Sequence, residues 1–262
     1  MNKQQRANVL CFSGHDPSGG AGIQADIETI ISLQGHCCSV ITALTEQDSR
    51  NVKRIIPQRP DDIRQQVQTL LADLPIAAIK IGLIGHVETA YVIHEVLQAY
   101  PQIPVILDPI LAAGGGTPLA SQDLQTAMID LLLPYTQVLT PNSLEARQLA
   151  QLDELAACGL RLQELGATYV LITGTHETSD IVHNQLTMPE GLSQIFNWER
   201  LPHSYHGSGC TLASAIAAIM AQGLDAFTAI HEAQDYTWQS LQNAYRPGQG
   251  QYNPQRLFWV DA

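Results

Sequence analysis

Along this chain, short apolar runs rich in β-branched residues alternate with longer segments in which apolar residues recur at helical spacing. The runs that predict buried strands are 9–12, 39–44, 77–81, 105–107, 137–139 and 169–172. The segments that predict helices are 23–33, 61–71, 89–97, 124–132, 143–149, 155–165, 210–222 and 226–244. Strands that alternate with helices in this way are typical of a parallel sheet with helices on both faces.

One stretch has a different period. Between 181 and 198 apolar and polar residues alternate, with Pro189 and Gly191 near the middle, which predicts an antiparallel hairpin at one edge of the sheet. We find no internal repeat, low-complexity tract or linker that would divide the chain. We therefore predict a single α/β domain over 1–262, with three layers and a mostly parallel central sheet.

Composition and charge narrow the classes of partner. The hydrophobic fraction is 45% and charged residues make up 15%, so the chain has enough apolar side chain to bury a core. The formal net charge is −12, and no run of Lys or Arg interrupts it. An acidic chain of this kind repels nucleic acid and anionic membrane surfaces, so we expect neither as a partner.

The cysteines and the apolar runs bear on the compartment. Five cysteines are an odd number, and Cys37 and Cys38 are adjacent, unlike the spaced framework of a small disulfide-bonded fold. The apolar stretch 9–12 is too short for a signal peptide, and no later run approaches the length of a membrane span. We expect a cytoplasmic protein with reduced thiols.

The loop after the first predicted strand is rich in glycine and leads directly into a helix, over 13–26. Such a loop lets backbone approach a ligand closely. The loop is neither a Walker A motif nor a GxGxxG turn in register, and a tight strand-to-helix turn would explain its glycines alone. Asp16 and Asp26 favour a binding loop, because both could accept hydrogen bonds from a polar ligand.

A second glycine-rich segment, 205–211, opens the apolar helix that follows it. The free amides at a helix N-terminus favour an anion, and Gly207 and Gly209 leave room for backbone alone to hold a phosphoryl group. We expect a thiol in the first helical turn to have a lowered pKa, which makes Cys210 a candidate reactive group rather than a small buried hydrophobe.

A third group of polar residues follows two neighbouring strands, with Asp108 after one and Asn142 and Glu145 after the next. Their oxygens could hold Mg²⁺ directly or through water. Taken alone, Asn142 and Glu145 would also fit a helix capping box. Together with the other loops they favour the metal. The nearby segments 114–116 and 173–176 suit close approach by phosphate or adenine.

Six runs, in this order, carry a family resemblance: DPSGGAGIQAD, SVITALTEQ, IKIGLIG, LDPIL, TPNSLEA and HGSGCT. Across 8–220 the chain resembles the bifunctional hydroxymethylpyrimidine/phosphomethylpyrimidine kinases of thiamine biosynthesis, which have the ribokinase-like fold. The resemblance implies ATP-dependent phosphorylation of 4-amino-5-hydroxymethyl-2-methylpyrimidine and then of its monophosphate. It also implies Mg²⁺, with K⁺ as a candidate monovalent ion, and a homodimer.

The same resemblance implies roles for individual residues. Gln47 would read the pyrimidine edge, with Gly14, Asp16 and Asp26 around the ring or its hydroxymethyl group. Cys210 would take the position of the catalytic base, in an anion hole formed by Gly207, Ser208 and Gly209. Asp108 and Glu145 match positions associated with Mg²⁺, and the residues placed at the nucleotide are Asn142, Thr173 and Gly174.

Three positions depart from the family pattern. Gly114 and Thr173 stand where family members commonly have lysine, and His15 stands where a small residue is more frequent. Without those lysines we expect metal, helix terminus and His176 or His206 to neutralise the triphosphate, with weaker ATP binding or a steeper dependence on cations.

Three alternatives remain at this point. The nearest is a pyridoxal kinase-like vitamin kinase, although such relatives usually carry aspartate in place of Cys210. The missing lysines suggest a second, a pyrimidine-binding protein without catalysis. A third, a dinucleotide-binding protein, would need a GxGxxG turn in register, which the chain lacks.

Overall fold

A single nine-stranded sheet runs through the computed structural model, which describes residues 6–260. The strand order is β3-β2-β1-β4-β5-β6-β7-β8-β9. The bounds are β1 Asn8–His15, β2 His36–Gln47, β3 Val52–Pro57, β4 Ile76–Ile81, β5 Val105–Leu107, β6 Val138–Leu139, β7 Tyr169–Ile172, β8 Ile181–Thr187 and β9 Ser193–Glu199. From β2 to β7 neighbours pair in parallel, whereas β3 at one edge and β8 and β9 at the other are antiparallel.

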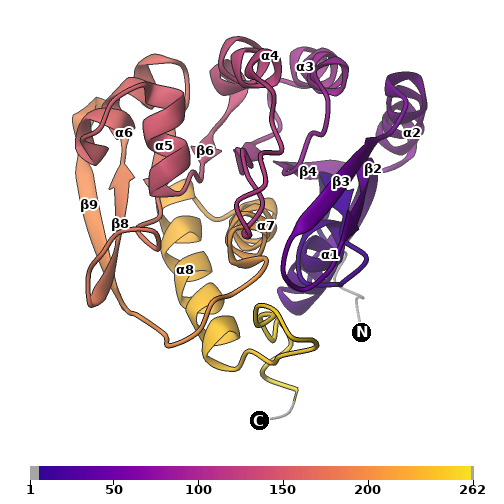
Figure 1. Cartoon of the computed structure of the whole chain (residues 1–262). Helices are drawn as coiled ribbons and strands as arrows, with labels where there is room; N and C mark the ends of the chain where they lie inside the picture. Colours follow the sequence, from indigo (N-terminus) through magenta and orange to yellow (C-terminus); the bar gives the residue numbers. More distant parts are fainter. Residues whose placement is uncertain (1–5, 261–262) are drawn as a thin grey trace, which may run out of the picture.

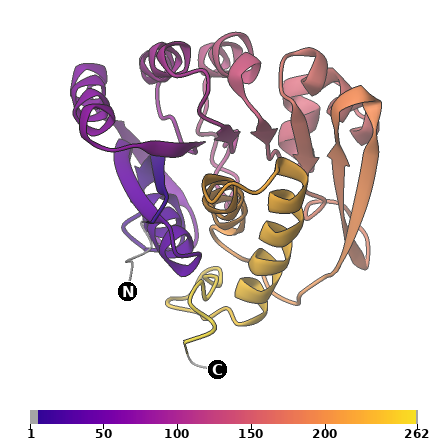
Figure 2. The same ribbon diagram turned by 180° about the vertical axis from the view of Figure 1, so that it is seen from behind.

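Helices cover both faces of the sheet (Figures 1 and 2). Their bounds are α1 Gly22–Ser32, α2 Pro60–Asp73, α3 Val87–Ala99, α4 Gln122–Ala127, α5 Ser143–Ala150, α6 Leu155–Glu164, α7 Ser208–Ala221 and α8 Ala226–Gln242. The buried side chains form two main clusters, one between the sheet and α2 to α6 and one between the sheet and α1, α7 and α8. The predicted three-layer fold is therefore confirmed.

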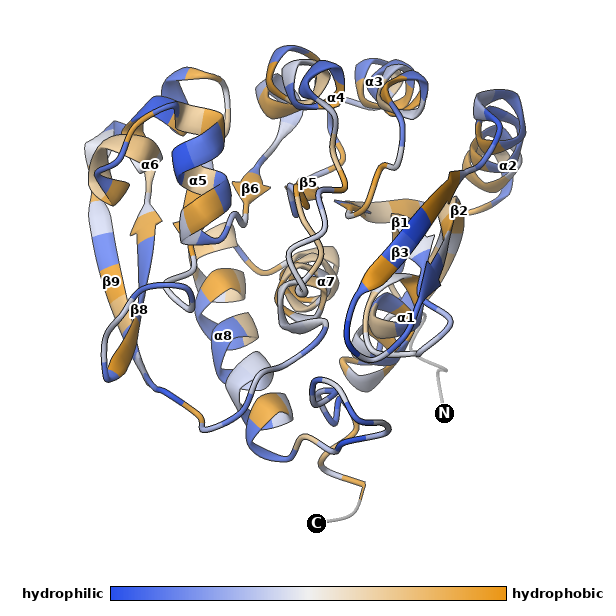
Figure 3. Ribbon diagram, viewed as in Figure 1, coloured by the Kyte–Doolittle hydropathy of each residue, from blue (hydrophilic) through white to orange (hydrophobic). Residues whose placement is uncertain are grey.

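Helix α7 lies at the centre of its layer. Every residue from Cys210 to Met220 is buried, and Figure 3 shows the helix in pale colours without a strongly hydrophilic face. A helix that is apolar on all sides is stable only when it is surrounded by protein. Its N-terminus is thereby held in a fixed place against the sheet.

The predicted elements match the structure closely, with two differences. The missed strand is β3, in which four of six residues are exposed, because an edge strand carrying Lys53 and Arg54 has the composition of a loop. The helix predicted over 124–132 ends as α4 at Ala127 and continues as a π-helical turn, Met128–Leu132. The predicted hairpin is confirmed as β8 and β9, joined by a short turn at Pro189–Gly191.

The glycine-rich and carboxylate-bearing loops gather at one end of the parallel strands. They follow the carboxyl ends of parallel strands, where open α/β sheets bind ligands. Among residues 6–260, no helix is long and apolar enough to span a membrane.

Candidate active site

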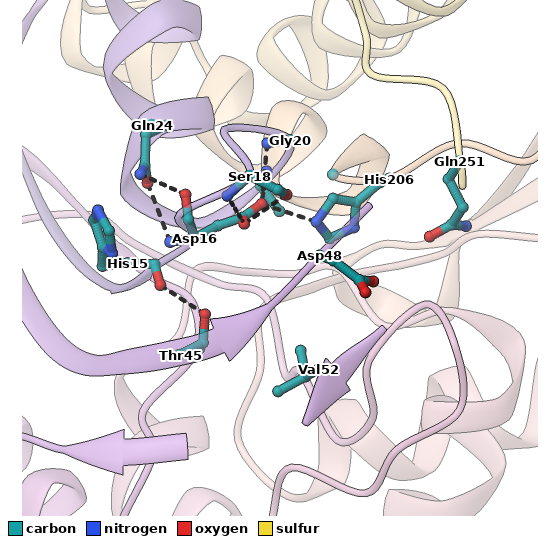
Figure 4. Close-up of polar contacts among 12 residues, drawn as sticks. His15, Asp16, Ser18, Gly20, Gln24, Thr45, Asp48, Val52, His206 and Gln251 are labelled. Carbon is teal, nitrogen blue, oxygen red and sulfur yellow. Dashed lines mark hydrogen bonds and ion pairs between the residues drawn. The ribbon is translucent and has the colours of Figure 1, made fainter. Parts of the chain in front are cut away.

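Asp16 organises the loop after β1. Its buried carboxylate accepts hydrogen bonds from the amides of Ser18, Gly20 and Ala21 at 2.8–3.0 Å, and lies 2.9 Å from Nε2 of His206 (Figure 4). Burial alone would raise the pKa of Asp16, but the hydrogen bonds from His206 and Ser18 hold that pKa well below its usual range. Asp16, predicted to contact substrate, thus directs its oxygens to protein donors and shapes the loop.

The glycines of this loop are required by close packing. A Cβ on Gly22, whose φ is +58°, would lie 2.3 Å from the carbonyl oxygen of Gly14. A Cβ on Gly14 would lie 2.6 Å from the Leu83 side chain. The predicted substrate residue Gly14 therefore sits where backbone alone fits, which agrees with a loop shaped for close approach.

A buried ion pair lies beneath this loop. Asp26 and Lys80 have no exposed surface, and Nζ of Lys80 lies 2.8 Å from Oδ1 of Asp26. Ser214 donates to the same oxygen at 2.7 Å, and Ser13 donates to the other. Burial would lower the pKa of Lys80, but Asp26 together with the nearby Cys210 and Asp108 outweighs burial and raises this pKa. Asp26, also predicted to contact substrate, is fully engaged with the protein.

The N-terminus of α7 meets the first loop directly. Gly207 precedes the helix with a φ of +86°, and a Cβ there would lie 1.9 Å from the carbonyl oxygen of Gly20. A Cβ on Gly209 would lie 3.5 Å from an oxygen of Asp108. The free amides of Ser208 and Gly209 therefore stand between two loops at the sheet edge, as an anion-binding turn requires.

The prediction of a lowered pKa for Cys210 is wrong. Cys210 is buried within this turn, and burial raises the pKa of its thiol to about 11. Lys80 opposes this rise, whereas Asp108 and Asp26 add to it. Proximity to a helix N-terminus therefore does not compensate for desolvation and two nearby carboxylates, and the group is a thiol at neutral pH.

Asp108 and Glu145 form a pair of buried carboxylates. Oε2 of Glu145 accepts from the amide of Asn142 at 2.9 Å, and Oε1 accepts from the amide of Leu111 at 3.2 Å. Asn142 in turn accepts from two amides of α5, so the capping box weighed from the sequence is present. Burial raises the pKa of Asp108 to about 6, and burial together with Asp108 raises that of Glu145 to about 8.

These carboxylates fit a hard divalent cation. Their repulsion and burial disfavour the anionic forms, and a bound cation would remove that penalty. No group of three or more His, Cys, Asp or Glu able to hold a metal occurs in the described part of the chain. An ion held here would therefore complete its shell with water and phosphate oxygens, as Mg²⁺ usually does.

The predicted nucleotide residues lie together after β6 and β7. Asn142 and Thr173 pair through an isolated parallel β-bridge, in which the amide of Ser143 donates to the carbonyl of Thr173 at 3.0 Å. A Cβ on Gly174 would lie 2.2 Å from the carbonyl oxygen of His183, so this position needs glycine.

Two arginines hold the loop that follows β7. Arg200 donates to the carbonyls of Thr175, Glu177 and Ser179 at 2.6–2.9 Å. Arg147 forms two hydrogen bonds to Glu177, which lowers the pKa of that carboxyl to about 2. Both guanidinium groups are therefore hydrogen-bonded to protein acceptors. The side chain of His176 is exposed.

Gln47, at the end of β2, lines a small pocket. Its other lining residues include Asn51, Gly114, His206 and Gln251. Figure 4 shows His206 and Gln251 entering this region from the C-terminal part of the chain, opposite Asp48. The structure thus brings Gln47, predicted to contact the pyrimidine edge, into the same pocket as His206, whose Nε2 points to Asp16.

Two residues of the site region escaped sequence reasoning. Lys80 stands alone as a charged residue in an otherwise apolar strand, and that isolation was the available signal. Arg256, whose guanidinium donates to the carbonyl of Gly20, lies far along the chain, and no pattern in the sequence connects it to the loops described above.

Comparisons with known proteins identify the family of this chain. The family model described as phosphomethylpyrimidine kinase matches residues 16–255. The hydroxymethylpyrimidine/phosphomethylpyrimidine kinase of Escherichia coli is 32% identical over 246 residues, covering 92% of each chain. The enzyme of that name from Synechococcus elongatus is 37% identical over 250 residues, covering 93% of this chain and 94% of its own.

A solved structure shares the whole architecture. The pyridoxal kinase of Bacillus subtilis, solved as an ADP complex, superposes with a TM-score of 0.90 at 26% identity, over 98% of this chain and 99% of its own. The two sequence relatives have a higher sequence identity to this chain than that kinase has, and their names agree with the family model. This chain belongs to the phosphomethylpyrimidine kinase family.

Proposed function

We propose that this chain transfers the γ-phosphoryl group of ATP to the hydroxymethyl group of 4-amino-5-hydroxymethyl-2-methylpyrimidine, and then to the resulting monophosphate, in thiamine biosynthesis. The observation that carries the proposal is that the first turn of α7, the loop after β1 and Asp108 meet at the carboxyl end of the parallel strands. The turn Gly207–Cys210 at the start of α7 contacts the glycine-rich loop after β1, here called the Gly14–Gly22 loop. The same turn faces Asp108. This junction occurs in a chain whose family is named for that chemistry.

The acceptor would lie between β2 and the first loop. Gln47 offers both a donor and an acceptor to the pyrimidine edge, and Leu83 packs against Gly14 so closely that only backbone fits there. Asp16 and Asp26 support this pocket indirectly, because their oxygens are bonded to protein groups. This changes the role that the resemblance implied for them from contact with the substrate to positioning of the loop.

Cys210 would accept or share the acceptor's proton during the first transfer. With a pKa of about 11 the group is a neutral thiol at neutral pH, and only its minor thiolate form could take up that proton. Phosphoryl transfer has a loose transition state in which placement and charge stabilisation matter more than base strength. The amides from Gly207 to Cys210 would supply that stabilisation, and an anionic monophosphate acceptor needs almost no base.

Asp108 and Glu145 would hold Mg²⁺ through oxygen and water ligands. The ion supplies charge neutralisation for the transferred phosphates. Asn142, Thr173 and Gly174 would contact the nucleotide from the loops after β6 and β7. The K⁺ requirement, the homodimer, the cytoplasmic location and the single domain over 1–262 stay predictions.

Pyridoxal phosphorylation is the second candidate, favoured by the superposition with the B. subtilis kinase. The test is ATP consumption with Mg²⁺ and three acceptors offered separately: hydroxymethylpyrimidine, its monophosphate and pyridoxal, with products identified by mass. Pyrimidine mono- and diphosphate are expected. Pyridoxal phosphate as the main product would replace the proposal, and pyrimidine binding without turnover would favour a binding protein.

A further inference from the structure

The C-terminal segment 249–256 returns across both glycine-rich loops after α8. It forms the yellow coil below α7 in Figure 1. The amide of His206 donates to the carbonyl of Tyr252 at 2.8 Å, and the amide of Gln251 donates to that of Ser49 at 2.9 Å. A Cβ on Gly20 would lie 2.6 Å from Oδ1 of Asn253. The segment is therefore packed against the candidate site.

Arg256 is the buried anchor of this segment. Its side chain is completely buried, and its carbonyl oxygen accepts from Ser32 and Tyr236, each at 2.7 Å. The guanidinium donates through Nη2 to the carbonyl of Gly20 at 2.5 Å and through Nε to Oγ1 of Thr211 at 2.9 Å. Its third partner is Glu28, at 2.9 Å from Nη1.

These bonds connect the two loops that would hold acceptor and phosphoryl group. Gly20 belongs to the loop organised by Asp16, and its amide donates to that carboxylate. Thr211 lies in the first turn of α7, and its hydroxyl donates to the carbonyl of Gly207 at 2.8 Å. A planar guanidinium with fixed donor directions defines the spacing between two acceptors more strictly than a flexible ammonium can.

The charge of Arg256 also lies close to the anion-binding turn. A Cβ on Gly207 would be 2.8 Å from Nη2. A fixed positive charge behind the N-terminus of α7 adds to the helix dipole, which already favours an anion there. This cation reaches the site from the C-terminal part of the sequence, far from Gly114 and Thr173, where the family resemblance implied lysines.

We propose that Arg256 is a positioning residue for phosphoryl transfer, holding the Gly14–Gly22 loop and the first turn of α7 at the separation that transfer requires. The inference rests on the proposed function, because it assigns acceptor and phosphoryl group to those two loops. The guanidinium of Arg256 is buried and bonded to Gly20, Thr211 and Glu28, so it would act through these loops rather than on a substrate. Its loss should therefore lower kcat, while the KM for the pyrimidine changes little.

The experiment compares R256Q, R256K and E28Q with wild type in full-length protein, using saturating Mg²⁺–ATP and the hydroxymethylpyrimidine acceptor. We expect R256Q to lower kcat by about tenfold or more, with pyrimidine KM within about threefold. R256K should recover part of that loss because it restores a donor. E28Q should stay within about twofold of wild type, because the bonds to Gly20 and Thr211 remain.

Thermal unfolding of each variant accompanies the kinetics. If R256Q does not fold, T211V and T211S replace it. Serine keeps the hydroxyl that accepts the hydrogen bond from Nε of Arg256, and valine does not. T211V should then have a kcat several-fold below T211S. Wild-type kcat in folded R256Q, or equal kcat in T211V and T211S, would overturn the assignment of Arg256. Absence of turnover in wild type would count against the proposed function itself.

Discussion

The two halves of the candidate site are built differently. The half to which we assign the pyrimidine, the pyrimidine half, comprises the loop 13–22, the end of β2 and the first turn of α7, above the Asp26–Lys80 pair. The half to which we assign the nucleotide, the nucleotide half, comprises the loops after β6 and β7, held by a capping box and by the partly exposed Arg147–Glu177 pair. Buried charges have stricter geometric demands than exposed ones, so the pyrimidine half should tolerate substitution less.

This difference bears on Thr173, where the family resemblance implied a lysine. Thr173 belongs to the half in which backbone amides, glycine and surface ion pairs determine the loop geometry. A cation lost there removes attraction for phosphate without leaving a buried partner unpaired. Fixed charge in the other half, from Lys80 and Arg256, is buried and paired.

The largest expected effect comes from breaking the Asp26–Lys80 pair. D26N would leave the buried ammonium without its anion and should lower the free energy of unfolding by about 3–5 kcal/mol. D61N, which removes the exposed partner of Arg64, is the matched control and should cost less than about 1 kcal/mol. Urea denaturation measures both, and similar losses in the two variants would show that the buried Asp26–Lys80 pair is no more sensitive than an exposed ion pair.

The next effect concerns Cys210 and separates the two transfers. C210A should slow phosphorylation of the hydroxymethyl acceptor by about 10²-fold, because the alcohol must lose a proton. Transfer to the monophosphate, whose acceptor oxygen is already anionic, should slow by less than about threefold. Initial rates with each acceptor provide the test. Equal losses would show that Cys210 serves packing rather than proton transfer.

A pH effect should follow from the buried carboxylates without Mg²⁺. The pKa of Glu145 rises from 4.5 in a free side chain to about 8. Between those values the folded protein retains a proton that the unfolded chain has lost, so stability should fall as pH rises through this range. Urea denaturation in EDTA at both ends of the range should show a steeper fall for wild type than for E145Q. Parallel profiles would contradict the raised pKa.

Mg²⁺ should reverse this trend at high pH. Binding requires ionised carboxylates, so the stabilisation by Mg²⁺ should grow with pH in wild type. E145Q, which lacks one of the two carboxylates, should gain less. Equal stabilisation of the two proteins at every pH would argue against Glu145 as a metal residue.

The smallest effect belongs to the surface of the nucleotide half. E177Q removes the partner of Arg147, and both side chains are about one-third exposed. The free energy of unfolding should change by less than about 1 kcal/mol. The KM for ATP should rise slightly, and the KM for the pyrimidine should stay unchanged. A change in the pyrimidine KM comparable to that in the ATP KM would mean that the halves are coupled.

Local patterns predicted most of the fold. The buried strands, their helices and the hairpin 181–198 each have a period that short stretches of sequence display. The edge strand β3 was missed because its pairing partner, rather than its composition, makes it a strand. The capping box at Asn142 and Glu145 was recognisable for the same reason as the helices, since its members are three residues apart.

Contacts between distant residues were beyond the reach of sequence patterns. The burial of Cys210, which reverses the expected direction of its pKa, depends on strands and loops contributed by the first half of the chain. The partners of Arg256 include Gly20, which is 236 residues away. The use of Asp16 and Asp26 inside the protein became visible only with His206, Lys80 and Ser214 in place.

A competition assay tests the central claim most directly. Wild-type protein with Mg²⁺–ATP receives equal concentrations of hydroxymethylpyrimidine and pyridoxal, and mass spectrometry follows both phosphorylated products at early times. Their ratio equals the ratio of the two kcat/KM values. A pyrimidine kinase should form the pyrimidine phosphates almost exclusively. Predominant pyridoxal phosphate would contradict the assignment, despite the family to which the chain belongs.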